Sequence, residues 1–555
     1  MKNFEKIKER LRQAPKSFWI FLAIMVLGIF LRTYHFHTWL DFENDQSRDA
    51  ILVSDVLSGK TAWPLVGPTM RGSQDAQANL FHLGPLYYYF QIISGEIFGN
   101  YPDKFAYPDL LFSILTIPLF YIFVKKYFSA NLSLALAGLF AISFFAVEYS
   151  RFAWNPNSLP FFSLLFLLAL YEFLTKGKKV SWQWAILAGV AIGVGVQLHI
   201  ITLLLFIVTV FFVFAYLLKK DWRIWKKIAA VILVVFIFNS PQIYSELKTG
   251  FSNAKIFLTA AASRDSAVKS KSSLATKVGN NLNCHMENNA YILSSSGSSN
   301  CIFSYETVIR KMFHDKKVKQ DWREIRQPKV AAGLILGFVF SFWGYVFLVI
   351  CAWKEKDEKK KIFLRLIGLY VGLSFFIMLP IAEKFTEARY FIQVFFVPFL
   401  FLGFLADFLM RKFYQRAVPF VAILFVMLAF FNLKSLGAAA KDLRAGTKSD
   451  VHFAILGEME KMVKYIADNA DGQKEIYLVG DKPYRAHFFQ PFWYLAEKEG
   501  VNIINVGENS PMVPRGSAIF YLTDKTRNGK TAEGGYEIES RRKFGKVSVY
   551  KLKGI

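Results

Sequence analysis

Residues 182–218 read WQWAILAGVAIGVGVQLHIITLLLFIVTVFFVFAYLL, a stretch with no Asp, Glu, Lys or Arg. It divides at Gln197-Leu198-His199 into two apolar runs, each long enough to cross the ~30 Å hydrocarbon core of a membrane. Similar runs recur along the 555 residues, which are 54% hydrophobic, contain 58 Phe and are only 20% charged. These features exclude a soluble protein and predict a polytopic membrane protein.

Orientation in the membrane also explains the net charge of +25. Lys and Arg gather in short clusters between the apolar runs, as at Lys125-Lys126 and from Lys354 to Lys361. Because cytosolic loops of membrane proteins are rich in Lys and Arg, the clusters indicate orientation, and we expect no nucleic-acid partner. One crossing pattern places every cluster, and a basic N-terminus at 1–16, in the cytosol. It has eleven spans, at about 17–36, 107–124, 131–149, 158–174, 182–198, 201–218, 228–245, 329–352, 362–381, 390–408 and 417–434.

An odd number of spans places the C-terminal segment outside the cytosol. We therefore expect a transmembrane module at 17–435 and an extracytoplasmic domain at 436–555. In that domain a helical pattern at 449–469 is followed by short apolar strands, which predicts a small α/β fold. The predicted fold class is mainly α, a polytopic helical bundle with a small C-terminal α/β domain.

Two outer loops of the transmembrane module are long. The first, 37–106, includes the segment Gly84 to Gly99, which is short for a span and reads as a helix on, or dipping into, the outer face. The third, 246–328, is rich in Ser, Asn and Lys and shows almost no helical periodicity. It contains Cys284 and Cys301, for which a disulfide and two free thiols are both open.

Acidic side chains gather directly after the first span, with one arginine among them: Asp41, Glu43, Asp45, Arg48, Asp49 and Asp55. If residues 45–57 form a helix, Asp45, Arg48 and Asp49 share one face at i, i+3 and i+4. Apolar side chains then cover another face, as in an amphipathic helix on the membrane surface. The alternative is that Asp45 caps this helix and the other charges are solvated.

Further motifs stand in predicted outer loops or at outer span ends: Gly84-Pro85-Leu86 in the first loop, Ser150-Arg151 with Asn155-Pro156 in the second loop, and Gln197-Leu198-His199 and Glu387-Ala388-Arg389-Tyr390 at span ends. Together with Asp45-Gln46-Ser47-Arg48-Asp49-Ala50, this ordered set resembles the GT-C superfamily of membrane glycosyltransferases. The likeness is to the branch of protein O-mannosyltransferases and lipid A aminoarabinose transferases, over about residues 10–435. The chain differs from that branch at Gln46, where a Glu is usual. It also lacks the Lys before the Pro-Leu motif, where His82 is the nearest polar residue.

The resemblance implies a catalytic role for Asp45. The acceptor of such an enzyme is usually a hydroxyl, which is a weak nucleophile until a base takes its proton, and a carboxylate suits that task. Asp45 matches the catalytic Asp of the family. Asp41 and Glu43 are further catalytic candidates, because either is able to supply the charge that is absent at Gln46.

Other candidates would bind the substrates. Arg389 and Arg151 are expected to stabilise the donor phosphate, because arginine binds phosphate through two parallel hydrogen bonds; the alternative is interfacial snorkelling. Glu148 is either a second acid or, as we favour, a partner of Arg151. His199 either caps a helix end or contacts the donor. The remaining candidates are Arg48, His82 and Tyr390.

These features predict an inverting transferase that moves a sugar from a polyprenyl-phosphate carrier to an extracytoplasmic hydroxyl. Its partners are the lipid-linked donor, membrane lipid and the acceptor, which is a protein, a lipid or an envelope glycan. No cofactor is required if arginines hold the phosphate, although Asp41, Glu43 and Asp45 are able to bind a divalent cation. The alternatives are a flippase for lipid-linked saccharides, which would need polar mid-span residues, and a binding protein that works through its C-terminal domain.

Overall fold

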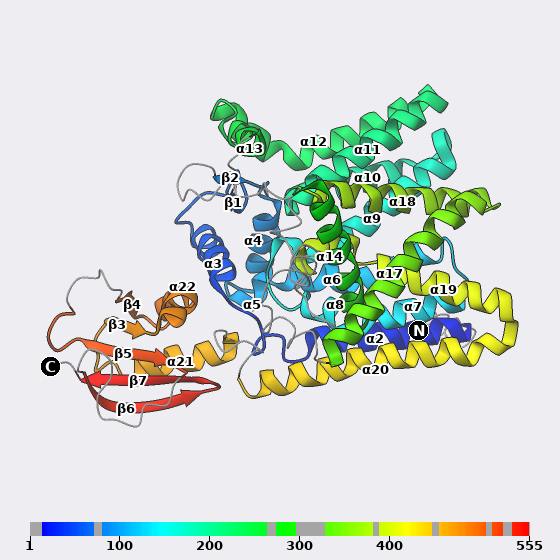
Figure 1. Ribbon diagram of the computed structural model, residues 1–555. Coiled ribbons are helices and arrows are strands. Elements are labelled where there is room, and N and C mark those ends of the chain that lie inside the picture. Colours follow the sequence, from blue (N-terminus) through cyan, green and yellow to red (C-terminus); the bar gives the residue numbers. More distant parts are fainter. Residues whose placement is uncertain are drawn as a thin grey trace, which may run out of the picture.

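The computed structural model describes residues 14–71, 80–262, 273–295, 328–380, 388–446, 454–506, 513–524 and 536–553. A bundle of helices forms its larger part, and a five-stranded sheet with helices α21 (Leu456–Asp468) and α22 (Lys482–Lys498) forms its C-terminal part (Figure 1). The predicted fold class, mainly α with a small C-terminal α/β domain, is confirmed. Much of the predicted basic segment 1–16 lies outside the described residues.

Each stretch predicted to cross the membrane contains a helix in the part that the structure describes. Eight helices in the described ranges are long and apolar enough to span a membrane. They are α2 (Lys16–Thr33), α6 (Tyr107–Val124, preceded by α5, Pro102–Phe105), α9 (Leu159–Lys176), α11 (Ile200–Lys220), α12 (Trp225–Lys248), α17 (Pro328–Lys354), α18 (Glu358–Met378) and α20 (Ala417–Arg444). Short 3₁₀ turns adjoin several of them, at η2 (Gly177–Lys179) after α9, η3 (Trp222–Ile224) between α11 and α12, and η6 (Tyr414–Arg416) before α20.

Three predicted spans depart from a straight transmembrane helix. η5 (Ala388–Val394) and α19 (Val397–Phe413) pass the same test only as a pair, bent by 57°. The helices α7 (Ala130–Ala141) and α10 (Trp182–Leu198) are apolar but shorter. The predicted stretch 131–149 breaks at Ser143, whose hydroxyl caps the next helix, α8 (Phe144–Glu148). The predicted total of eleven spans therefore requires α7 and α10 to cross as well.

Helix α9 lies at the centre of the bundle. Of its most apolar 18-residue window, 78% is buried within the protein, whereas the same measure is 11% for α2. A helix that is apolar all round and exposed, as α2 is, needs lipid to cover it. The burial pattern thus separates the protein core around α9 from a lipid-facing periphery.

The third outer loop differs from its prediction. Helix α13 (Ser252–Ala262) follows α12, and helix α14 (Leu274–Ser294) packs against α17, α19 and α8. The amide of Asn281 donates to the carbonyl of Phe375 at 2.8 Å, and that of Asn289 to the hydroxyl of Ser341 at 2.9 Å. These two bonds to neighbouring helices help to explain why α14 is buried despite a composition typical of a loop. Cys301 lies outside the described residues, so the two alternatives for Cys284 and Cys301, a disulfide or two free thiols, both stay open.

The first outer loop folds into α3 (Asn44–Leu57), a small hairpin of β1 (Thr69–Arg71) and β2 (Leu80–His82), and α4 (Leu86–Phe98). Helix α4 confirms the helix predicted in the segment 84–99. It begins after Pro85 and ends at Gly99, whose φ of 116° is available mainly to glycine. Helix α3 packs against α4, so the loop forms an ordered layer over the bundle.

The C-terminal sheet has the strand order β4-β3-β5-β7-β6. Its strands are β3 (Glu475–Gly480), β4 (Asn502–Asn505), β5 (Ala518–Thr523), β6 (Glu537–Phe544) and β7 (Val547–Lys553). β3 pairs in parallel with β4 and β5, and β7 runs antiparallel to β5 and β6. Strand β6 has no counterpart among the predicted strands, because its alternating charged residues place it at an edge with little apolar content.

The C-terminal domain docks onto the first outer loop, as Figure 1 shows for α22 and α3. The backbone N–H of Leu456 donates to the carbonyl of Leu40 at 2.9 Å. The hydroxyls of Ser54 and Tyr494 share a hydrogen bond of 3.0 Å. Gly457 approaches so closely that a Cβ there would lie 3.0 Å from the carbonyl oxygen of Thr38. The domain and α3 therefore lie on the same side of the bundle.

Candidate functional site

The start of helix α3 is built as a capping box. Glu43 is the N-cap, and its backbone N–H is bonded to the side chain of Gln46 at 3.1 Å, while the Glu43 side chain accepts from the Gln46 N–H. This reciprocal pair satisfies two N–H groups that a helix start leaves open. The alternative interpretation, in which Asp45 caps the helix, is therefore wrong. The side chain of Gln46 accepts from the Glu43 backbone N–H, and the Glu that is usual at this position is able to accept the same bond.

Asp45, Arg48 and Asp49 share a face of α3, as their spacing predicts. Nη1 of Arg48 lies 3.0 Å from Oδ1 of Asp45, and Nη2 lies 2.8 Å from Oδ1 of Asp49. The side chain of Asp45 is 58% exposed, whereas that of Asp49 is 3% exposed. Burial raises the pKa of Asp49 to about 6, even though Arg48 opposes the shift. One arginine thus joins a solvent-exposed carboxylate to a buried one.

Two neighbouring tyrosines of α4 continue this network into the bundle. The hydroxyl of Tyr88 donates to Asp49 at 3.1 Å, and that of Tyr87 donates to Asp109 at 3.0 Å. Asp109 is fully buried and also accepts from the hydroxyl of Ser158 at 2.6 Å. It further accepts from the backbone N–H of Trp154 at 3.1 Å. Helix α4 therefore ties α3 to the loop before η1 (Asn155–Ser158).

Arg389 is far from this loop in the sequence but contacts it in the fold. Its guanidinium carbon lies 5.7 Å from the ring centroid of Trp154 and 5.1 Å from that of Tyr390, within the range of cation–π contact. The ring of Tyr390 lies 6.0 Å from that of His199. His199 also caps α11, because its Nδ1 accepts from the N–H of Ile201 at 3.3 Å. The structure thus brings together Arg389, Tyr390 and His199 and gives His199 the capping position.

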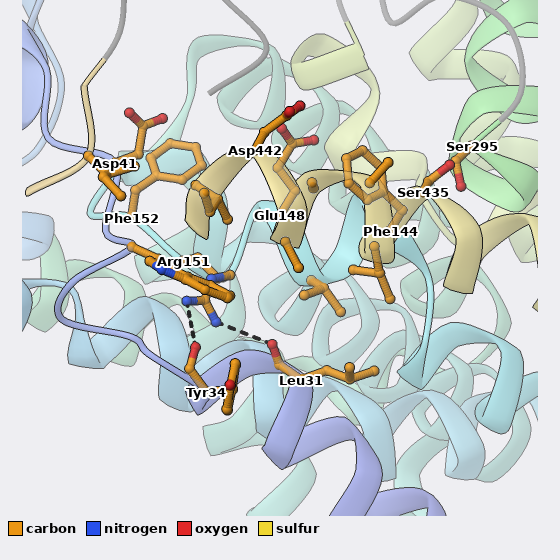
Figure 2. Close-up of a pocket in the computed structure, with 18 of the residues that line it drawn as sticks. Leu31, Tyr34, Asp41, Phe144, Glu148, Arg151, Phe152, Ser295, Ser435 and Asp442 are labelled. Carbon is orange, nitrogen blue, oxygen red and sulfur yellow. Dashed lines mark hydrogen bonds between the residues drawn. The ribbon is translucent and has the colours of Figure 1, made fainter. Parts of the chain in front are cut away.

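A second group of predicted residues lines a cavity of about 390 Å³ that contains Asp41, Glu148 and Arg151 (Figure 2). Arg151 donates to four backbone carbonyls, those of Leu31, Arg32, Tyr34 and His35, at 2.8–3.3 Å. These carbonyls lie at and beyond the C-terminal end of α2, where a cation is favourable. Glu148 accepts from the hydroxyl of Tyr291 at 3.3 Å. The expected Glu148–Arg151 pair is replaced by these two separate contacts.

His82 lies apart from both groups. Its Nδ1 is 3.0 Å from the carbonyl of Gly67, and its backbone N–H donates to Asn253 at 2.6 Å. These contacts tie the β1–β2 hairpin to α13. Among the described residues, no three His, Cys, Asp or Glu side chains gather closely enough to hold a metal ion, and this includes Asp41, Glu43 and Asp45.

The network also contains residues absent from the predicted site: Asp49, Tyr88, Tyr87, Asp109, Trp154 and Ser158. Asp109 could have been found from the sequence, because an acid inside the apolar run 107–124 is costly in a membrane and usually has a function. The two tyrosines could not have been found in this way, since an aromatic belt at the membrane surface explains their positions equally well.

An ordered outer loop with paired carboxylates, above a bundle of apolar helices, is the arrangement that the motifs predict for a GT-C membrane enzyme. Residues 82–244 match the family model described as dolichyl-phosphate-mannose-protein mannosyltransferase. This match confirms the resemblance to the GT-C membrane glycosyltransferases. No curated protein sequence matches the chain significantly.

Two solved structures are similar to the chain at low identity. One is ArnT from Cupriavidus metallidurans bound to undecaprenyl phosphate, with 14% identity, coverage of 97% of this chain and 98% of ArnT, and a TM-score of 0.46. The other is the Archaeoglobus fulgidus oligosaccharyltransferase in complex with Zn and sulfate. It has 11% identity, covers 87% of this chain and 62% of its own, and gives a TM-score of 0.45.

Proposed function

We propose that the protein transfers a sugar, with inversion, from a polyprenyl-phosphate carrier to a hydroxyl outside the cytosol. The observation that carries this proposal is the exposed Asp45 carboxylate, which Arg48 orients at 3.0 Å. The matched family model supports the donor class, because its description names a sugar on a polyprenyl phosphate.

Asp45 acts as the base in this proposal. The acceptor oxygen attacks the anomeric carbon while its proton passes to Asp45. The bond from that carbon to the phosphate oxygen breaks, and the carrier phosphate leaves with the electron pair. Arg48 fixes the orientation of the Asp45 carboxylate through their contact at 3.0 Å.

Arg389 stabilises the departing phosphate. Its guanidinium is positioned against two aromatic rings rather than extended into solvent, so little motion is lost when it binds an anion. Asp109 and Tyr87 act as positioning residues, since Asp109 accepts from the Trp154 N–H beneath the guanidinium.

The site faces away from the cytosol. Asp109, Ser158 and His199 lie near the starts of α6, α9 and α11, while basic residues follow the ends of these helices. Because clusters of Lys and Arg favour the cytosolic side, the polar network belongs to the outer side.

A transfer assay tests the proposal. Purified full-length protein in lipid is given a panel of radiolabelled polyprenyl-phosphate monosaccharides and a crude envelope extract. Asp45→Asn, which keeps the size and removes the base, is expected to lower transfer by about 10²–10⁴-fold. Asp55→Asn, later in the same helix, is the matched control and should retain activity. If no donor is consumed by the wild type, the transferase proposal is wrong and a flippase becomes the better explanation.

A further inference from the structure

His37 lies in the turn after α2, at the junction between the transmembrane module and the C-terminal domain. Its Nδ1 is 3.3 Å from a carboxylate oxygen of Asp103 on α5, and its Nε2 is 3.3 Å from a carboxylate oxygen of Glu460 on α21. The side chain is 43% exposed, so it is able to exchange a proton with solvent. One imidazole ring therefore stands between an acid of the transmembrane module and an acid of the domain.

Further contacts position the two acids beside the ring. Asp103 is 2% exposed, and the oxygen that faces His37 is also 2.9 Å from Nζ of Lys104. Glu460 accepts a hydrogen bond from the hydroxyl of Tyr101 through the oxygen that faces His37. The ring of Tyr101 lies 5.7 Å from the imidazole. Because other groups hold both acids, the imidazole meets them whatever its own charge.

Only the protonated ring satisfies both contacts. An imidazolium donates from both nitrogens, whereas a neutral imidazole donates from one and carries a lone pair on the other. An ionised carboxylate only accepts hydrogen bonds, so a neutral His37 sets two acceptors against each other at 3.3 Å, toward either Asp103 or Glu460. Loss of the proton therefore weakens a contact that joins the module to the domain.

The other charged groups at this junction are lysines, an arginine and carboxylates, together with one more histidine. Apart from Lys104, the lysines, the arginine and the remaining acids line the hollow beside Glu460: Arg444, Glu458, Lys461, Lys464, Lys498 and Glu499. His35 also lines this hollow, and its Nδ1 lies 3.4 Å from the hydroxyl of Thr38. His37 contacts both acids, and histidine is the side chain whose charge ordinarily changes between pH 5 and 8. His37 is therefore the group that makes this junction respond to pH.

We infer that His37 is a proton-dependent latch between the two parts of the protein. The protonated ring holds α21 against α5, and loss of the proton loosens this junction. Nearby carboxylates favour the charged form of a histidine, so the contribution is present near pH 5 and is lost as the pH rises toward 8. The inference goes beyond the proposed function and does not depend on it.

The change is a local loosening, because other contacts keep the domain attached. Nζ of Lys60 lies 3.5 Å from Asp55 on α3 and 3.4 Å from Glu497 on α22, so a second cation joins the two parts. Lysine ordinarily keeps its charge between pH 5 and 8. The junction at Lys60 therefore serves as a pH-independent reference for the junction at His37.

Hydrogen–deuterium exchange of the full-length protein in phosphatidylcholine nanodiscs tests the latch without requiring turnover. Exchange is followed at pH 5.5 and 7.5 and corrected for the intrinsic pH dependence of amide exchange. We expect the amides of residues 101–106 and 456–464 to be about three- to tenfold more protected at pH 5.5. The amides around Lys60 and Glu497 should change less than about twofold. Equal protection of 101–106 and 456–464 at both pH values would overturn the inference.

Variants of the two histidines assign the effect to His37. His37→Gln keeps a hydrogen-bond donor but does not titrate, so the difference between the two pH values should fall below about twofold. His37→Lys keeps a cation at both pH values, as Lys60 does between Asp55 and Glu497, and should keep the high protection at pH 7.5. His35→Gln, in the same turn, is the matched control and should retain the wild-type difference. A full pH difference in His37→Gln, or its loss in His35→Gln, would contradict the latch.

Discussion

The carboxylate of Asp45 lies 3.0 Å from the guanidinium of Arg48, one turn further along the same helix. Asp45 is more than half exposed, and Arg48 is also bonded to the buried Asp49. Arg48, itself held by the buried Asp49, therefore fixes the position of the exposed Asp45. This arrangement combines access for a substrate with a defined orientation, which a proton acceptor in a transfer reaction requires.

Arg48→Lys should lower the transfer rate about tenfold or more. Lysine keeps the charge but cannot bond Asp45 and Asp49 at once through a planar fork, so the orientation of Asp45 is lost. The rate at saturating donor and acceptor measures this effect. Lys60→Ala, which removes an exposed cation that pairs with Asp55 and Glu497, is the control and should leave the rate unchanged. Wild-type activity in Arg48→Lys would show that the fork is unimportant.

Gln46→Glu should leave activity within about twofold of the wild type, because both residues complete the capping box with Glu43. Gln46→Ala should lower the stability of the protein by about 1 kcal/mol, the usual cost of losing a helix cap. Thermal unfolding and transfer are measured in parallel. A large gain of activity in Gln46→Glu would indicate instead that a second carboxylate is needed at this position.

Tyr88→Phe removes the hydroxyl that donates to Asp49 at 3.1 Å. We expect about a three- to tenfold loss of rate, since the buried acid then loses one of the bonds that hold it against Arg48. Tyr89→Phe is the matched control. Its hydroxyl donates to the carbonyl of Pro64, outside the network, so the same deletion should affect the rate little. Equal losses in both variants would contradict a positioning role for Tyr88.

The pKa of Asp49 predicts a pH-dependent stability. Burial raises it from its ordinary value of 3.8 to about 6, so the folded protein binds this proton more tightly than the unfolded chain. The resulting contribution is complete below about pH 4 and is lost as the pH rises through 6, with a size on the order of 3 kcal/mol.

The Asp49→Asn side chain does not titrate, so the variant does not lose stability in this way. As the pH increases from 4 to 6, its free energy of unfolding should therefore rise relative to that of the wild type. Unfolding temperatures of both proteins across that range measure the difference. Parallel curves would show that Asp49 does not titrate as its burial requires.

Much of the fold is predictable because membrane helices and amphipathic helices have strong periodic signals. Helix α3 follows from the spacing of Asp45, Arg48 and Asp49, and the outer segments of α6, α9 and α11 follow from apolar runs and basic clusters. Helix α14 is not predictable in this way. Two of its asparagines, Asn281 and Asn289, bond to neighbouring helices, and a single sequence does not distinguish buried amides from solvated ones.

The site is predictable only in part, for a similar reason. Motif spacing brings Asp45 and Arg48 together correctly, because both lie on one helix. Arg151 and Glu148, close in sequence, take different partners, since the carbonyls beyond α2 compete for the arginine. Contacts between distant segments, such as that of Arg389 with Trp154, depend on how the helices pack.

The most direct test of the central claim is a single-turnover measurement with one labelled polyprenyl-phosphate sugar, in which donor binding and product formation are followed separately. The account predicts that Asp45→Asn binds the donor like the wild type but forms product at least about 10²-fold more slowly. Arg389→Ala should instead weaken donor binding, because the phosphate loses its cation. Product formation by Asp45→Asn at the wild-type rate, in a folded protein, would contradict the claim that Asp45 is the base.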